Sequence, residues 1–176
     1  MPFAYYAKLS AARQRIYRQS DAIEALELPA AVDAGARIAR IRTGLGGEDR
    51  TTVQAACQDL IDVLVAAYRV PKIRIRVLAK RPADGSGELH GLYEPDEAGA
   101  PARITVWMRT AARRDVVAFK TFLRTLIHEL CHHLDYELYR LPETFHTEGF
   151  YKRESSLVNE LLRREGALAD PQGRLI

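Results

Sequence analysis

The chain has 176 residues, of which 47% are hydrophobic and 28% are charged, and its formal net charge is +3. These values exclude a disordered chain, a collagen-like repeat and a disulfide scaffold, and they fit one globular domain with a sizeable core. The charge permits an acidic partner such as nucleic acid but does not require one. Only five histidines are present, and four of them lie between positions 128 and 146.

Cysteine content and hydropathy indicate the compartment. The two cysteines, Cys57 and Cys131, are too few for a disulfide framework and favour a reducing environment. No run approaches 18 apolar residues, and the first ten residues lack the pattern of a secretory signal. We therefore expect a cytoplasmic protein without a membrane partner. The oligomeric state is left open.

Apolar residues recur at helical spacing in the first part of the chain. Pro29 interrupts the first of these segments, and the Gly44–Gly47 turn ends the second. We expect three helices, over 5–27, over about 30–42, and from near Asp49 or Thr51 onward.

The pattern then changes to period two, which is typical of strands with one buried face. Ile73, Ile75 and Val77, for example, alternate with Arg74 and Arg76. The segments with this alternation are 72–77 and 104–108, and 89–93 is a short further strand candidate. Together they predict a small antiparallel or mixed sheet.

Two further helices are expected after the strands. A broad apolar stripe predicts a long helix over about 115–140, with Asp115 as its N-cap. A final helix is expected over about 148–165, with Gly166 at its end. The order of elements predicts an α+β fold in a single domain, 1–176, with an N-terminal helical extension (1–48) and a catalytic core (49–166).

The segment His128-Glu129-Leu130-Cys131-His132 has the form H-E-x-x-H and lies inside the predicted long helix. Positions i and i+4 project from one helix face, so both imidazoles can reach one metal ion. The side chain of Glu129 points away from the face that His128 and His132 share, so it is not a metal ligand. It stays close enough to take a proton from a water molecule bound to the metal. This arrangement is the one needed for zinc-assisted hydrolysis of a peptide bond.

A catalytic zinc site needs a third protein ligand. His146 is the leading candidate, because it lies 14 residues after His132, where the chain can fold back over the helix. Glu148 and Glu154 compete for this role, and the sequence does not decide among the three.

Other residues near the pattern have weaker assignments. Asp135 either orients an imidazole or faces solvent. His133 points away from the ligand pair, and Cys131 is expected to fill the core. Among the tyrosines that could stabilise a developing oxyanion, Tyr151 is preferred because it follows the loop of His146.

The stretch from His128 to Phe150, H-E-L-C-H…H-T-E-G-F, resembles the SprT-like zinc metallopeptidases of the zincin superfamily. The resemblance implies Zn²⁺ held by His128, His132 and His146, with Glu129 as the catalytic base. It also implies a zincin-like fold, in which an edge strand before the active helix pairs with extended substrate; Ile104–Met108 has the right place in the order. Thr147 stands where these peptidases carry a glycine.

The expected function is therefore a zinc metallopeptidase, an endopeptidase acting on peptide or protein substrates. The alternative is a non-proteolytic zinc-binding module, regulatory or DNA-associated, on the same fold. Nucleic acid is the weaker partner, although some SprT-like proteins act on DNA-bound proteins. The basic clusters that could serve it are Arg13, Arg15 and Arg18; Arg37, Arg40 and Arg42; and Arg113 and Arg114.

Overall fold

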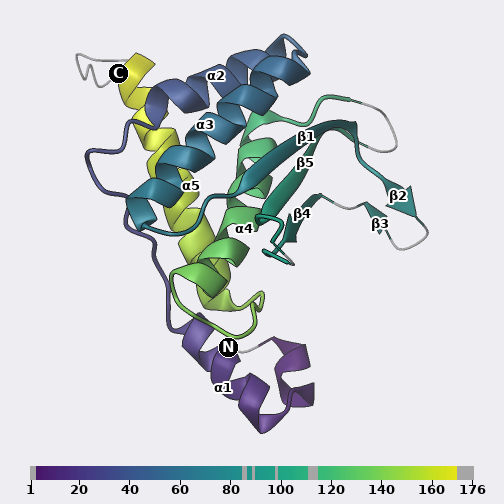
Figure 1. The fold of residues 1–176 in the computed structure, drawn as a ribbon, viewed down its shortest axis with the longest axis vertical. Coiled ribbons are helices and arrows are strands. Elements are labelled where there is room, and N and C mark those ends of the chain that lie inside the picture. The colour runs from purple at the N-terminus through teal and green to yellow at the C-terminus, as the bar shows by residue number, and fades with distance from the viewer. Residues whose placement is uncertain (1–2, 85–86, 89, 98, 111–114, 170–176) are drawn as a thin grey trace.

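The fold is α+β, with a small three-stranded mixed sheet on one side of the molecule and the larger helices packed beside it (Figure 1). The structure, a computed structural model, describes residues 3–84, 87–88, 90–97, 99–110 and 115–169. Among these residues, no helix combines the length and the apolar character of a membrane span. The elements are η1 (Ala4–Lys8), α1 (Ala11–Asp21), α2 (Gly35–Gly46), α3 (Arg50–Tyr68), β1 (Arg74–Lys80), β2 (Ala83–Asp84), β3 (Gly87–Glu88), β4 (Gly91–Glu94), β5 (Arg103–Arg109), α4 (Phe119–Glu137) and α5 (Glu148–Ala169).

The three main strands overlap the three predicted segments and lie in the order β1-β5-β4. β1 pairs with β5 in parallel, and β4 pairs with β5 antiparallel. The expectation that Ile104–Met108 forms an edge strand is wrong, because β5 has a strand on either side. β4 is the edge strand on the side of α4.

The other outer edge, that of β1, is covered by two glutamines of α3. The amide of Gln54 donates to the carbonyl of Ile75 at 2.7 Å, and its oxygen accepts the N–H of Val77 at 2.7 Å. Gln58 repeats this pattern one turn later, with Ile73 and Ile75. The side chains replace a neighbouring strand and blunt that edge.

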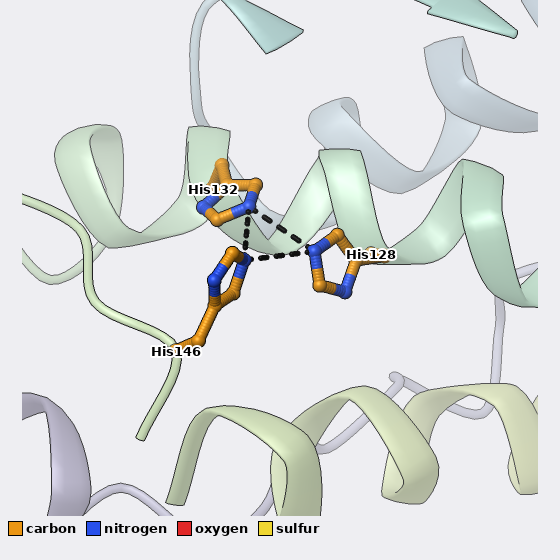
Figure 2. A group of neighbouring side chains, drawn as sticks. All are labelled: His128, His132 and His146. Carbon is orange, nitrogen blue, oxygen red and sulfur yellow. Dashed lines mark hydrogen bonds between the residues drawn. The ribbon is translucent and has the colours of Figure 1, made fainter. Parts of the chain in front are cut away.

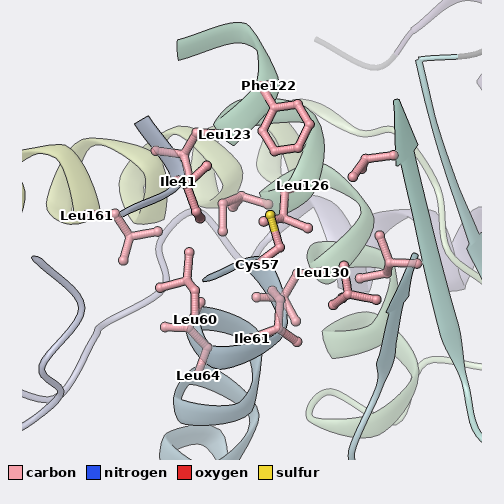
Figure 3. Close-up of a cluster of buried hydrophobic side chains, with 14 of the residues drawn as sticks. Ile41, Cys57, Leu60, Ile61, Leu64, Phe122, Leu123, Leu126, Leu130 and Leu161 are labelled. Atoms are coloured by element: carbon pink, nitrogen blue, oxygen red, sulfur yellow. The ribbon is translucent and has the colours of Figure 1, made fainter. Parts of the chain in front are cut away.

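The core lies between the sheet and the helices. α4 packs against β4 and β5 on one side and against α5 on the other, and α2 packs against α3 and α5 (Figure 1). Both cysteines are buried and unpaired, and Cys131 fills the core as expected. Figure 3 labels Ile41, Cys57, Leu60, Ile61, Leu64, Phe122, Leu123, Leu126, Leu130 and Leu161 of this core.

The single helix expected over 5–27 is wrong, since this segment forms two shorter ones, η1 and α1. Ser10 is extended and its hydroxyl accepts the N–H of Arg13, which starts α1. Arg153 of α5 donates to the carbonyls of Ser20 and Ile23 at 2.9 and 3.2 Å, and α1 ends there. The buried guanidinium of Arg153 therefore binds backbone carbonyls that would accept hydrogen bonds from the following turn if α1 were longer.

The next two helices lie close to their predicted positions. α2 begins at Gly35, later than the expected residue 30, and ends at the predicted glycine turn. α3 follows Asp49, whose carboxylate accepts the N–H groups of Thr51 and Thr52 at 3.0 and 3.1 Å. Asp49 is therefore the N-cap of α3, and the helix starts within the predicted interval from Asp49 to Thr51.

The helix that carries the H-E-x-x-H segment is shorter than the expected 115–140. Asp115 is not its N-cap, because the carbonyl of Asp115 accepts the N–H of Thr110 and extends the pairing beyond β5. Helix α4 begins only at Phe119.

The last helix, α5, continues through the predicted stop at Gly166 to Ala169. Its start is fixed by Gly149, whose N–H donates to the carboxylate of Asp21 at 2.9 Å. A Cβ at this position would lie 2.6 Å from the carbonyl carbon of Asp21, so only glycine lets α1 approach so closely.

Candidate functional site

Three imidazoles converge at one point between α4 and the loop that follows it (Figure 2). His128 and His132 project from one face of α4, and His146 comes from the loop before α5. The Nε2 atom of His128 lies 3.0 Å from that of His146 and 3.3 Å from that of His132. The Nε2 atoms of His132 and His146 are 3.1 Å apart.

The far side of two of these rings has fixed hydrogen-bond partners. Nδ1 of His128 lies 2.8 Å from the carboxylate of Glu154, and Nδ1 of His132 lies 2.8 Å from the hydroxyl of Thr144. A carboxylate only accepts, so the hydrogen of the neutral His128 ring is on Nδ1. Its Nε2 lone pair is then directed at the cluster, as a metal ligand requires.

The spacing of the cluster fits a tetrahedral ion. Nitrogens bound to one zinc at the usual 2.0–2.1 Å are about 3.3–3.4 Å apart in tetrahedral geometry. The three observed separations, 3.0–3.3 Å, are close to this value. Converging imidazole lone pairs repel each other unless a cation lies between them. The donor set therefore fits zinc, and His128, His132 and His146 are the residues that could hold it.

A buried relay supports the ring of His132. The hydroxyl of Thr144 donates to the carboxylate of Asp135 at 2.7 Å and is thereby left to accept from the imidazole. Asp135 forms an ion pair with Arg153, and both side chains are fully buried. Arg153 in turn donates to the hydroxyl of Ser20 at 2.9 Å. Asp135 thus does not face solvent and orients the imidazole through Thr144.

Glu129 lies beside the cluster and is only 7% exposed. Its carboxylate packs against the backbone of Gly91 in β4 and accepts a hydrogen bond from the backbone of Tyr93. Burial is the main cause that raises the pKa of Glu129 to about 7. A carboxylate with a pKa near neutrality is suited to accept and return a proton.

Burial also favours the neutral form of two of the clustered histidines, His132 and His146. It lowers the pKa of His132 to about 3, with help from the neighbouring imidazoles, and it lowers the pKa of His146. Neutral imidazole is the form that binds metal.

The cluster opens into a cleft of about 770 Å³. The edge strand β4 forms one wall from Gly91 to Tyr93, and α4 contributes His128 and Glu129. Tyr151 from α5 lies on the same cleft. A ligand in this cleft would therefore meet the imidazoles, the buried carboxylate and the exposed edge of the sheet together.

The carboxylates of the two glutamates that compete with His146 lie outside the group of converging imidazole nitrogens. The carboxylate of Glu154 contacts Nδ1 of His128 and also Arg124, so it supports a ring rather than joining the cluster. Glu148 is half-exposed and its carboxylate lies 3.1 Å from the ammonium of Lys152.

Tyr151 lies at the rim of the cleft, whereas His133 is buried away from it. Tyr151 is 42% exposed, and its ring stacks on His146 with centroids 5.9 Å apart. His133 is buried outside the cluster, as predicted; Nε2 lies 3.0 Å from the carbonyl of Pro71 and Nδ1 lies 3.0 Å from the hydroxyl of Tyr93.

Several arginines of the basic clusters are engaged in ion pairs. Arg37 and Arg40 contact Asp59, and Arg42 contacts Glu165. Arg13 contacts Glu143. Arg113 and Arg114 lie outside the described residues.

Sequence reasoning missed two residues of the site. Thr144 belongs to no recognisable pattern, and only the fold brings it between His132 and Asp135. Gly91 carries a weak signal, since a glycine inside a predicted strand indicates close backbone approach.

Comparison of the chain with protein families, with curated proteins and with solved structures finds no match.

Proposed function

We propose that this protein is a zinc-dependent metallopeptidase with a zincin-like fold, similar to the SprT-like enzymes, and that it hydrolyses internal peptide bonds. The observation that supports this most strongly is the convergence of three imidazole Nε2 atoms, 3.0–3.3 Å apart, beside the buried carboxylate of Glu129.

The residues of the site have complementary roles in this proposal. Zinc held by the three histidines would supply Lewis acidity, which polarises a carbonyl and acidifies water. Glu129 accepts the proton of the attacking water and returns it to the leaving amine. Glu154 and Thr144 hold the rings of His128 and His132, so that both Nε2 lone pairs stay directed at the same point.

The substrate proposed for this site is an extended polypeptide. β4 is the edge strand and borders the cleft next to Glu129. Adding a strand to such an edge is a general way to bind a peptide, because backbone hydrogen bonds position it independently of its sequence. The peptide bond to be cleaved would then lie against α4.

Replacement of the base tests the proposal. The zinc-loaded chain is incubated with an unfolded protein substrate, and Glu129→Gln is compared with wild type for zinc content and cleavage rate. Zinc content should stay equal while the rate falls by about 10²–10⁴-fold, the usual contribution of a general base. Glu137→Gln, on the same helix but outside the site, is the matched control and should keep the rate.

Two outcomes would contradict the proposal. An unchanged rate in Glu129→Gln would show that this carboxylate is not the base. A wild-type chain that holds zinc and cleaves no substrate would favour the non-proteolytic zinc-binding module.

A further inference from the structure

Large apolar side chains gather at the surface around the cleft. Five are exposed among the described residues, and Leu168 alone lies far along α5. The other four, Phe3, Tyr5, Leu92 and Tyr151, are 37–42% exposed and line the cleft or the hollow beside it. Soluble proteins scatter such residues singly, so their concentration at one place indicates a binding surface.

The hollow beside the cleft is built from the N-terminal segment. It measures about 610 Å³ and is bounded by Phe3, Ala4, Tyr5, Lys8, His146 and Tyr151. His146 and Tyr151 line the cleft as well. The hollow therefore adjoins the candidate metal centre across one of its proposed ligands. We call it the aromatic hollow.

The walls of the aromatic hollow are rings packed against one another. Phe3 stacks on Tyr5 with centroids 6.3 Å apart, and it meets the ring of Tyr151 edge-on at 6.1 Å. Tyr151 stacks on His146. Rings arranged in this way present apolar faces and edges to a third ring or to an aliphatic side chain.

Specific hydrogen bonds hold the N-terminal segment in this position. The hydroxyl of Tyr5 donates to the carbonyl of His146 at 2.9 Å. The N–H of Phe3 donates to the hydroxyl of Tyr17, a fully buried residue of α1, at 3.1 Å. The hollow is thus anchored both to the loop that carries His146 and to the first helix.

From this arrangement we infer that the aromatic hollow receives an aromatic or large aliphatic side chain of the polypeptide substrate, close to the bond that is cleaved. The inference rests on the proposed function. The occupant is chosen because the hollow shares His146 and Tyr151 with the cleft, and because Lys8 is the one charged residue other than histidine among the described residues that line it. The cleft would then select substrates through the N-terminal segment, and β4 would bind their backbone.

Cleavage of a mixed peptide library by the zinc-loaded full chain tests this selectivity. Large apolar residues should be enriched at one position at a fixed distance from the cleaved bond. In Phe3→Ala, kcat/KM for peptides with phenylalanine at that position should fall by about 10-fold or more, the scale expected for lost contacts in an apolar pocket. The same peptides with alanine there should be cleaved as by wild type.

Leu168→Ala serves as the matched control, because among the described residues it removes the one exposed large apolar side chain that lines neither the cleft nor the aromatic hollow. This variant should leave both rates unchanged. Absence of any apolar preference in the library would overturn the inference while leaving the proposed peptidase intact. Faster cleavage by Phe3→Ala would also overturn it, since the segment would then cover the cleft instead of receiving substrate.

A binding measurement separates the inference from catalysis. The blocked tripeptide acetyl-Ala-Phe-Ala-amide is titrated into isotope-labelled Glu129→Gln, with acetyl-Ala-Ala-Ala-amide as the reference probe. The resonances of Phe3, Tyr5 and Tyr151 should shift with the phenylalanine probe, and Phe3→Asp should abolish these shifts. Equal shifts with both probes would overturn the inference. Failure to hold zinc or to cleave peptides would instead overturn the proposed function.

Discussion

The hydroxyl of Thr144 lies 2.8 Å from Nδ1 of His132 and donates in turn to Asp135 at 2.7 Å. One hydroxyl thus connects a candidate metal ligand to a buried ion pair. Because the hydroxyl hydrogen is committed to the carboxylate, the imidazole must donate to the oxygen, and its Nε2 lone pair is left for the cluster. The tautomer of His132 is therefore set by residues outside the cluster.

Loss of this hydroxyl should weaken metal binding. Thr144→Val keeps the shape of the side chain but removes the acceptor of the His132 hydrogen. Zinc affinity, measured by competition with a chromophoric chelator, should fall by about 10–100-fold, as is usual for outer partners of metal ligands. Thr144→Ser restores the hydroxyl and should recover most of the affinity. Equal affinities in all three proteins would show that Thr144 has no role in orienting the ring.

A side chain at position 91 should displace the proposed base. A Cβ built on Gly91 would lie 2.8 Å from Cγ of Glu129, so Gly91→Ala must move this carboxylate. We expect a cleavage rate well below that of wild type with unchanged zinc affinity, because the three atoms nearest to the added methyl group all belong to Glu129. Glu94→Gln, a change in the same strand at a residue that does not line the cleft, controls for effects on the strand. A fully active Gly91→Ala protein would contradict the placement of Glu129.

The buried pair of Asp135 and Arg153 should be important for stability. Arg153→Met leaves the carboxylate of Asp135 buried without its cation, and breaking such pairs costs about 3–5 kcal/mol. Urea unfolding should show this decrease in the free energy of unfolding. The double variant Asp135→Leu/Arg153→Met should recover part of it, since no charge is then left unpaired. A single variant as stable as wild type would show that the pair is dispensable.

The tyrosine at the rim of the cleft is predicted to act through its hydroxyl. Tyr151→Phe retains the ring that stacks on His146 but removes the proposed oxyanion donor. The value of kcat should fall by about 10²–10³-fold, the usual effect of losing one such donor. Zinc affinity and apolar preference should persist because the ring is kept. An unchanged kcat would restrict Tyr151 to a role in the aromatic hollow.

Much of the fold follows from local patterns. The apolar stripe locates α4, and an aspartate cap locates the start of α3. The strands were also recognisable, but which strand lies at an edge depends on neighbours that no local pattern encodes. β5 is interior because β1 and β4 pair with it from distant parts of the chain.

Errors in the predicted helices have the same origin. The first helix ends at Asp21 because Arg153, far along the chain, takes carbonyls near its end. The fourth begins at Phe119 because the preceding residues continue the pairing of the sheet. In both places long-range contacts override the local preference.

Only the part of the candidate site that lies on one helix follows from the sequence. Spacing alone places His128 and His132 on one face of α4. His146 was one of three candidates for the third position, and only the folded loop shows that its Nε2 atom meets the other two. Thr144 was unpredictable, because its role depends on Asp135 and His132 approaching it from α4.

Zinc binding by single-histidine variants is the decisive test of the metal centre formed by His128, His132 and His146. Wild-type protein titrated with zinc against a chelator should bind one ion per chain. His128→Ala and His146→Ala should each lose more affinity than the 10–100-fold typical of an outer partner. His90→Ala, which changes the one histidine outside positions 128–146, should bind as wild type does. Wild-type zinc affinity in His146→Ala would show that His146 is not a zinc ligand. Glu148 or Glu154 would then be the candidate for the third ligand.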